Sequence, residues 1–197
     1  KHLDTYGTLK NFHEKNVIQI NDTHPALAIP ELMRLLIDEN GMSWDDAWSI
    51  TTSVCAYTNH TVLAEALETW PEDLIARRLP RIYTILKEIN RRFCEDLWKR
   101  FPGDWDKISR MAIMSYNVVK MANLSVHGSH HVNGVSGLHS EIIKESIFKD
   151  FYDYTPNKFT NVTNGIAHRR WLNQANPELC ALLNDCIGEG YAKDAAK

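Results

Sequence analysis

Two residues that could bind a sugar follow a short β-prone run near the start of the chain. Asp22 and His24 stand between Val17–Ile20 and a helical pattern that begins at about Pro25. A carboxylate there could orient the imidazole, and both groups could hydrogen-bond a neutral polyol. Asp also commonly caps a helix, and a nearby His then lies at the surface. From the spacing alone, we favour the helix cap.

A second polar segment, Asn59-His60-Thr61, lies at what we interpret as a helix terminus and precedes Glu65, Glu68 and Trp70. Trp70 could stack on a sugar ring or pack in a core. If the segment is helical, Glu65 and Glu68 share a face. They could then form a glycosidase-like acid and base pair. A solvated acidic face is the commoner outcome for such a pair, and we favour it.

One interval of the chain holds four histidines, His127, His130, His131 and His139. Their spacing matches neither the HExxH pattern nor any cysteine pattern of zinc proteins, so we expect no metal site. The glycines among them, Gly128, Gly134 and Gly137, lack the order of a dinucleotide fingerprint. They do suggest that the backbone closely approaches another group at a helix start.

A third polar segment, Asn164 to Trp171, contains a flexible glycine, an indole and the pair Arg169-Arg170. Paired arginines can hold a phosphate through charge-assisted hydrogen bonds. They can equally hold two domains together through ion pairs. The sequence favours neither role.

The elements that position these residues are mostly helices. A capping box at Ser43 opens one helix. Another follows Pro80 with a regular apolar stripe, a further one spans about Asp106 to Met121, and Asn176 caps the last. The clear β-prone runs are Val17–Ile20 and Leu124–Val126, and Phe151 to Asn164 has no period, as expected of a crossover. Since two strands make no stable parallel sheet, we predict an α/β chain that contributes to a larger sheet.

Composition narrows the function classes. The 197 residues carry a formal charge of −3, which provides no general field for nucleic acid. No apolar run approaches the length of a membrane span, and the first residues contain no apolar signal-peptide core, so we expect no membrane partner. The four cysteines are scattered, which suggests reduced thiols in a cytoplasmic protein.

Five collinear blocks covering nearly the whole chain closely resemble the α-glucan phosphorylase family, which includes glycogen, starch and maltodextrin phosphorylases. The blocks are NDTHPALAIPELMR (21–34), AYTNHTVLAEALETW (56–70), GSHHVNGV (128–135), HSEIIKESIFKDFY (139–152) and TNGIAHRRW (163–171). The resemblance implies a retaining glycosyltransferase with two Rossmann domains (GT-B type), in which inorganic phosphate cleaves terminal α-1,4-glucosidic bonds to release glucose 1-phosphate. It also implies a homodimeric parent enzyme.

The resemblance assigns roles to individual residues. His60 would contact the transferred sugar as the catalytic-site residue, Asn164 would hydrogen-bond its primary hydroxyl, and the backbone at Val135 would line the same pocket. Asp22 and His24 would face the remaining glucan, which replaces the cap favoured above. These assignments make the polar segments parts of one substrate site.

The family uses pyridoxal 5′-phosphate through its phosphate group, and Trp171 matches a wall of the cofactor pocket. The glycine-rich motif that carries the family's cofactor lysine does not occur in this sequence, nor do its phosphate-binding lysine and arginine. Ala167-His168 also replaces the Thr-Pro that the family often has. We therefore expect an inactive central fragment without bound cofactor, whose partner is the remainder of a phosphorylase chain.

The expected domains are residues 1–158, the later part of the amino-terminal domain, and 159–197, the crossover and the start of the second domain. A glucan-binding or assembly module without chemistry is the alternative. A histidine-cluster metal hydrolase is a remote third possibility.

Overall fold

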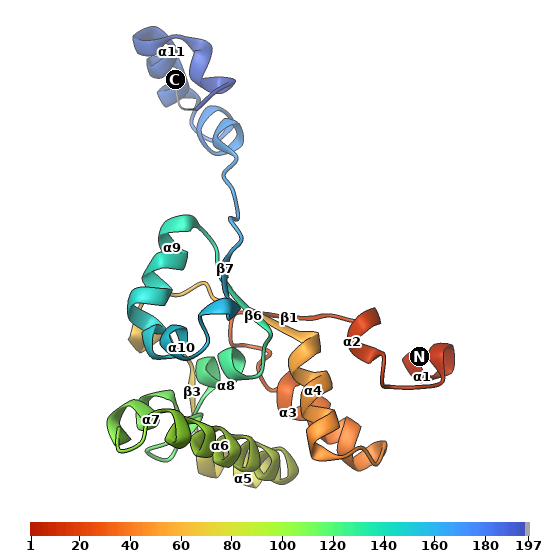
Figure 1. Cartoon of the computed structure of the whole chain (residues 1–197). Helices are drawn as coiled ribbons and strands as arrows, with labels where there is room; N and C mark the ends of the chain where they lie inside the picture. Colours follow the sequence, from red (N-terminus) through yellow and green to blue (C-terminus); the bar gives the residue numbers. More distant parts are fainter. Residues whose placement is uncertain (196–197) are drawn as a thin grey trace. The chain divides into compact units, whose positions relative to one another are not determined.

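The computed structural model describes residues 1–195 and divides into two compact units (Figure 1). The first unit is Lys1–Thr163 and the second begins at Asn164. Positions 196 and 197, which end the second expected domain, lie outside the described residues. The boundary falls five residues after the position expected from sequence, because Phe159–Asn161 forms a strand of the first unit.

The first unit contains a four-stranded parallel sheet in the order β1-β2-β6-β7. Its strands are β1 (Ile18–Asn21), β2 (Cys55–Thr58), β6 (His131–Gly134) and β7 (Phe159–Asn161). Ile20 pairs with Tyr57, and Tyr57 pairs with Val132. All three side chains are fully buried in the core. The sheet thus has more strands than the clear β-prone runs of the sequence indicate, because β2, β6 and β7 are short and mix polar with apolar residues.

Helices connect and surround the sheet (Figure 1). They are α3 (Ala28–Arg34) with the π-helical turn η1 (Leu35–Glu39), α4 (Trp44–Val54), α9 (Gly137–Ile142) with the π-helical turn η3 (Ile143–Ile147), α10 (Lys149–Tyr154) and the 3₁₀ turn η4 (Pro156–Lys158). Two short helices, α1 (His2–Tyr6) and α2 (Phe12–Lys15), precede β1 and lie to one side of the sheet (Figure 1). The predicted cap of α4 is confirmed, since Ser43 Oγ accepts a hydrogen bond from the Asp46 amide.

A long insertion joins β2 to β6 and carries a second, antiparallel sheet in the order β3-β5-β4. Its elements are η2 (Ala64–Ala66), β3 (Thr69–Pro71), α5 (Glu72–Arg78), α6 (Pro80–Arg100), α7 (Trp105–Met111), β4 (Met114–Ser115), β5 (Val118–Lys120) and α8 (Met121–His127). The predicted stripe of α6 is confirmed, because every stripe residue is buried: Ile82, Ile85, Leu86, Ile89, Phe93 and Leu97.

Two predictions about the end of the insertion are wrong. The helix expected from Asp106 to Met121 stops at Met111, and a hairpin follows with positive φ at both turn residues, Tyr116 and Asn117. Leu124–Val126 is not a strand but lies in the second half of α8, whose residues from Met121 to Val126 are all buried. A fully buried helix has the same continuous apolar pattern as a buried strand.

The second unit contains the π-helical segment η5 (Arg169–Gln174), α11 (Pro177–Ile187) and the 3₁₀ turn η6 (Glu189–Ala192). Asn176 Oδ1 accepts from the Leu179 amide, which confirms the predicted cap, and α11 ends at Gly188, where φ is +74°. Two large apolar side chains of α11, Leu182 and Ile187, are largely exposed. None of the helices within residues 1–195 combines the length and the apolar character that crossing a bilayer requires.

Candidate functional site

The sequence-predicted residues of the first unit gather where the parallel strands end. Asp22 follows β1, His60 lies two residues after β2, and Val135 follows β6. Hydrogen bonds continue the sheet just past the strands: the Asp22 amide donates to Thr58 O (2.9 Å), and the Asn59 amide donates to Asn133 O (3.0 Å). The carboxyl edge of a parallel sheet is where such folds bind ligands.

Asp22 does not cap a helix. Its φ is +61°, its Oδ1 accepts from the next amide, that of Thr23 (2.7 Å), and α3 begins six residues later without a side-chain cap. The cap favoured from spacing is therefore wrong. The positive φ turns the chain sharply at the end of β1, and such backbone strain in a non-glycine residue is typical of functional sites. His24 is exposed in the loop that follows.

Glu68 anchors this loop to the insertion. Its Oε2 accepts from Thr23 Oγ1 (2.7 Å), and its Oε1 accepts from Trp70 Nε1 (2.9 Å). Glu65 lies on the 3₁₀ turn η2, whereas Glu68 directly precedes β3, so the two do not share a helical face. The hypothesis of an acid and base pair on one helix is therefore wrong, and Glu68 instead fixes the position of Thr23, which is buried.

His60 lies at the surface of this edge. Its Nε2 is 2.6 Å from Asn21 Oδ1. Because this oxygen accepts, Nε2 donates the hydrogen bond, and Nδ1 remains available as an acceptor. The residue before it is buried: Asn59 donates to Tyr57 Oη (2.9 Å) and accepts from the Thr61 amide (3.0 Å). The turn around His60 is thus attached to the core, where burial raises the pKa of Tyr57.

A row of polar side chains crosses the sheet at the same edge. Gln19 Nε2 donates to Thr58 Oγ1 (2.8 Å), and Thr58 Oγ1 donates to Asn133 Oδ1 (2.8 Å). These bonds connect β1, β2 and β6 near their carboxyl ends. Such a network holds the strand ends, and therefore the loops that follow them, in fixed register.

His139 joins the two loops that hold His60 and Val135. The Val135 amide donates to His139 Nδ1 (3.0 Å), and His139 Nε2 lies 3.1 Å from Thr61 O. Sequence reasoning missed this role, because it treated the residue only as one of four clustered histidines. The available signal was its place two residues after Gly137, the last of the clustered glycines.

The four clustered histidines do not converge on one point, although the rings of His130 and His131 contact each other edge to face. His127 stacks on Phe93 with ring centroids 3.9 Å apart, whereas His130 and His131 are exposed. Within residues 1–195, no group of three or more histidine, cysteine or acidic side chains is arranged to hold a metal ion.

Asn164 and Trp171 belong to the second unit. Both are exposed there, and the Trp171 amide donates to Ala167 O (2.9 Å). Arg169 donates to Ala192 O (3.2 Å) in the same unit. The structure therefore brings together the loops that hold Asp22, His60 and Val135, whereas Asn164 and Trp171 belong to the second unit.

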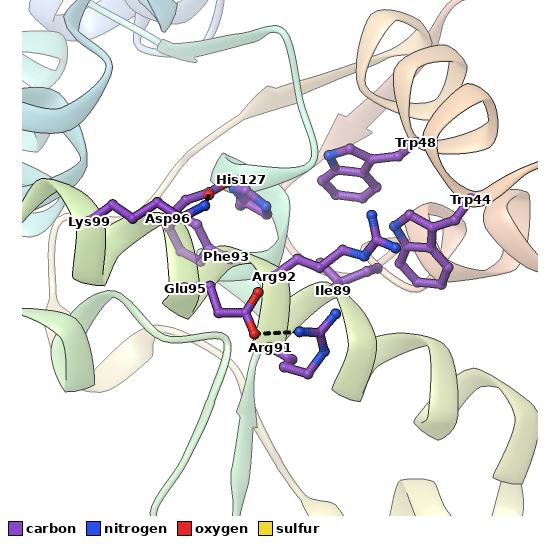
Figure 2. Close-up of a pocket in the computed structure, with 10 residues that line it drawn as sticks. All are labelled: Trp44, Trp48, Ile89, Arg91, Arg92, Phe93, Glu95, Asp96, Lys99 and His127. Atoms are coloured by element: carbon purple, nitrogen blue, oxygen red, sulfur yellow. Dashed lines mark hydrogen bonds and ion pairs between the residues drawn. The ribbon is translucent and has the colours of Figure 1, made fainter.

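A pocket of about 390 Å³ lies elsewhere in the first unit (Figure 2). It is lined by residues of α4 and α6 and by His127, the last residue of α8. In the chain, α4 precedes β2, and α6 and α8 precede β6, whereas the site residues follow these two strands. The three cations at its rim are ion-paired: Arg91 with Glu88 and Glu95, Arg92 with Glu88 and Asp45, and Lys99 with Asp96. The pocket is thus separate from the site at the sheet edge.

Comparison with known proteins gives a consistent result. Residues 1–197 match the family described as carbohydrate phosphorylase. The chain is 54% identical to a glycogen phosphorylase of Bacillus subtilis over 96% of its length, and 53% identical to the muscle forms from Bos taurus and Homo sapiens over 93%. It spans 24%, 22% and 22% of those proteins, respectively.

Proposed function

The chain belongs to the carbohydrate phosphorylase family, and from this premise we propose that it is the central part of an α-glucan phosphorylase of the GT-B type. The whole enzyme would use inorganic phosphate to cleave terminal α-1,4-glucosidic bonds and release glucose 1-phosphate. It would be a cytoplasmic homodimer. The observation that carries this proposal is the convergence of Asp22, His60 and Val135 at one edge of the sheet, within sequence blocks shared with the family.

The geometry supports a division of work among these residues. His60, whose Nε2 is held by Asn21, would present its other ring nitrogen to the hydroxyls of the transferred sugar. The backbone at Val135 would line the same pocket. Asp22 and His24 would face the rest of the glucan, and Asn164 of the second unit would bind the primary hydroxyl of the sugar. Neutral hydroxyls suit these donors and acceptors.

Pyridoxal phosphate is the cofactor that the family implies, and it would act through its phosphate group in the whole enzyme. The described residues do not fit this group on their own. Trp171, proposed as a wall of its pocket, is 59% exposed. The ammonium groups of Lys120 and Lys158, both partly buried, donate to backbone carbonyls instead. We therefore propose that the isolated chain neither binds the cofactor nor catalyses phosphorolysis.

The test is glucose 1-phosphate release from maltoheptaose and phosphate, with pyridoxal phosphate supplied, by the isolated chain and by the longer enzyme that contains it. We expect product from the longer enzyme alone. In that enzyme, His60→Ala should lower kcat/KM strongly, whereas His131→Phe, at an exposed position before the site, should not. Turnover by the isolated chain would contradict its proposed inactivity.

A glucan-binding or assembly module without chemistry is the second candidate. The two clear β-prone runs of the sequence count against a stand-alone module, because two strands are too few for a stable parallel sheet. The structure removes this objection, since the first unit has a four-stranded sheet around a continuous core. Cooperative unfolding and saturable maltooligosaccharide binding by the chain, with no phosphorolysis by the longer protein, would favour this second function.

A further inference from the structure

We propose that His139 is a positioning residue for the sugar site, holding the loop after β2 and the loop after β6 at a fixed separation. The inference rests on the proposed function, because it assigns those loops to substrate. The loops come from strands that are neighbours in the sheet but distant in sequence. Beyond the last ladder bond, from the Asn59 amide to Asn133 O, the sheet itself no longer sets their spacing.

The two hydrogen bonds of His139 define its tautomer. The Val135 amide can only donate, so Nδ1 must accept and carry no proton. Nε2 is then the protonated nitrogen, and it donates to Thr61 O at 3.1 Å. Each ring nitrogen thus binds one of the two loops. We call this pair of hydrogen bonds the His139 brace. One of its bonds ends at Thr61, the residue after His60, and the other at Val135, a proposed lining residue, so both lie beside the proposed sugar contacts.

Burial and the contacts of neighbouring residues hold the His139 imidazole in position. Its side chain is only 7% exposed, and its own amide donates to Ser136 Oγ (3.1 Å), the cap of α9. The next residue, Ser140, packs directly against Gly134 at the end of β6 and donates to Oδ1 of Asn161 (2.8 Å), the last residue of β7. The helix turn that carries His139 is therefore capped by Ser136 and attached to the sheet through Ser140.

The brace predicts a graded loss of catalysis when its bonds are removed. His139→Asn retains an acceptor near the position of Nδ1, His139→Gln retains a donor near that of Nε2, and His139→Phe retains the ring but neither bond. A misplacement of about 1 Å in a site can cost roughly a hundredfold in rate. We expect His139→Phe to lower kcat/KM about 10- to 100-fold, with the other two variants between it and the wild type.

The experiment measures kcat, KM and thermal midpoint for phosphorolysis by the longer enzyme, well below the midpoint of each variant. His130→Phe is the matched control, because this exposed histidine lies before β6 and its ring hydrogen-bonds Cys55 O at the start of β2, away from the site loops. A purely structural role would lower the midpoint and leave the turnover of folded enzyme unchanged. The proposal is overturned if His139→Phe stays within twofold of the wild-type kcat/KM, or if His130→Phe loses as much.

A second measurement does not depend on the activity. The ¹⁵N shifts of the His139 ring in the 197-residue chain should show a protonated Nε2 and an unprotonated Nδ1. If the wild-type longer protein lacks phosphorolysis but this tautomer is found, the proposed function is wrong. The two hydrogen bonds of His139 are then confirmed as a structural link between the loops. A protonated Nδ1 would overturn the brace regardless of activity.

Discussion

A Cβ placed on Gly134 would lie 2.6 Å from Ser140 Oγ and 2.9 Å from both Ser140 Cα and its backbone nitrogen. Two of these three atoms are backbone, so no rotation of a side chain could relieve the contact. Glycine is thus required for the end of β6 to approach α9 this closely. The same approach places the Val135 amide within reach of His139.

Gly134→Ala should therefore destabilise the chain. Overpacking of a tight contact typically costs about 1–3 kcal/mol, and we expect a loss in that range in urea unfolding. Gly137→Ala is the matched control, since nothing lies within 4 Å of its added methyl group and the position is in a helix. This control should be neutral or slightly stabilising. Equal urea midpoints for Gly134→Ala and Gly137→Ala would contradict the close contact between Gly134 and Ser140.

His127 should make the stability fall in mild acid. Burial, followed by the nearby charge of Lys158, lowers the pKa of His127 to about 3. The unfolded chain, where the group titrates near 6.5, then binds more protons than the folded one between these values. The free energy of unfolding should therefore fall as the pH drops from about 6.5 towards 3.

Because the ring retains some contact with solvent through the pocket, we expect a loss of only about 1–2 kcal/mol from pH 7 to pH 5. Comparison of unfolding at the two pH values in His127→Phe isolates the effect, since a phenyl ring can keep the stacking on Phe93 without titrating. His13→Phe, at an exposed position, is the control. The same acid loss in His127→Phe as in the wild type would contradict the assignment.

Lys158→Met should raise the pKa of His127. Lys158 Nζ donates to Val126 O (3.2 Å) and His127 O (3.0 Å) at the end of α8, and its charge disfavours protonation of the imidazole. Removing the charge should move the pKa of His127 upward, but it should stay below 6.5 because burial is the larger cause. NMR titration of the ring measures this shift, and Lys149→Met, an exposed lysine, should leave it unchanged.

The turn between β4 and β5 can be made more stable by substitution. Tyr116 and Asn117 have φ values of +53° and +61°, the pattern of a type I′ turn. Tyrosine is unfavourable in this region, so the double variant Tyr116→Asn, Asn117→Gly should stabilise the chain by about 1 kcal/mol. Tyr116 is 82% exposed, so its loss removes little packing. A lower unfolding midpoint would show that the turn has a different type.

Sequence patterns predicted the features that depend on local spacing. The stripe of α6, the cap of α4 at Ser43 and the cap of α11 at Asn176 are all confirmed. Each depends on neighbouring residues within one or two turns, which the sequence displays directly.

The errors arose where long-range contacts decide the structure. β6 has only four residues and includes the exposed His131, yet it becomes a central strand because Tyr57 of β2 pairs with Val132. The Tyr-Asn turn does not carry the usual Asn-Gly signal of a hairpin. At the candidate site, residue types identified Asp22 and His60 as polar groups, but only the sheet order brings their loops together. The role of His139 likewise requires knowing that β2 and β6 are adjacent.

The order of the parallel sheet also affects how the chain folds. The bond between Thr58 and Asn133 joins residues 75 positions apart, and the whole insertion with its helices and antiparallel hairpin lies between them. Pairing of this kind is slow, because the chain entropy of closing a long loop is lost before any contact compensates for it. During synthesis, β1 and β2 leave the ribosome well before β6. The edge that carries the candidate site is therefore completed late. Until then, the edge of β2 that faces away from β1 has no partner strand, and other chains can bind to it.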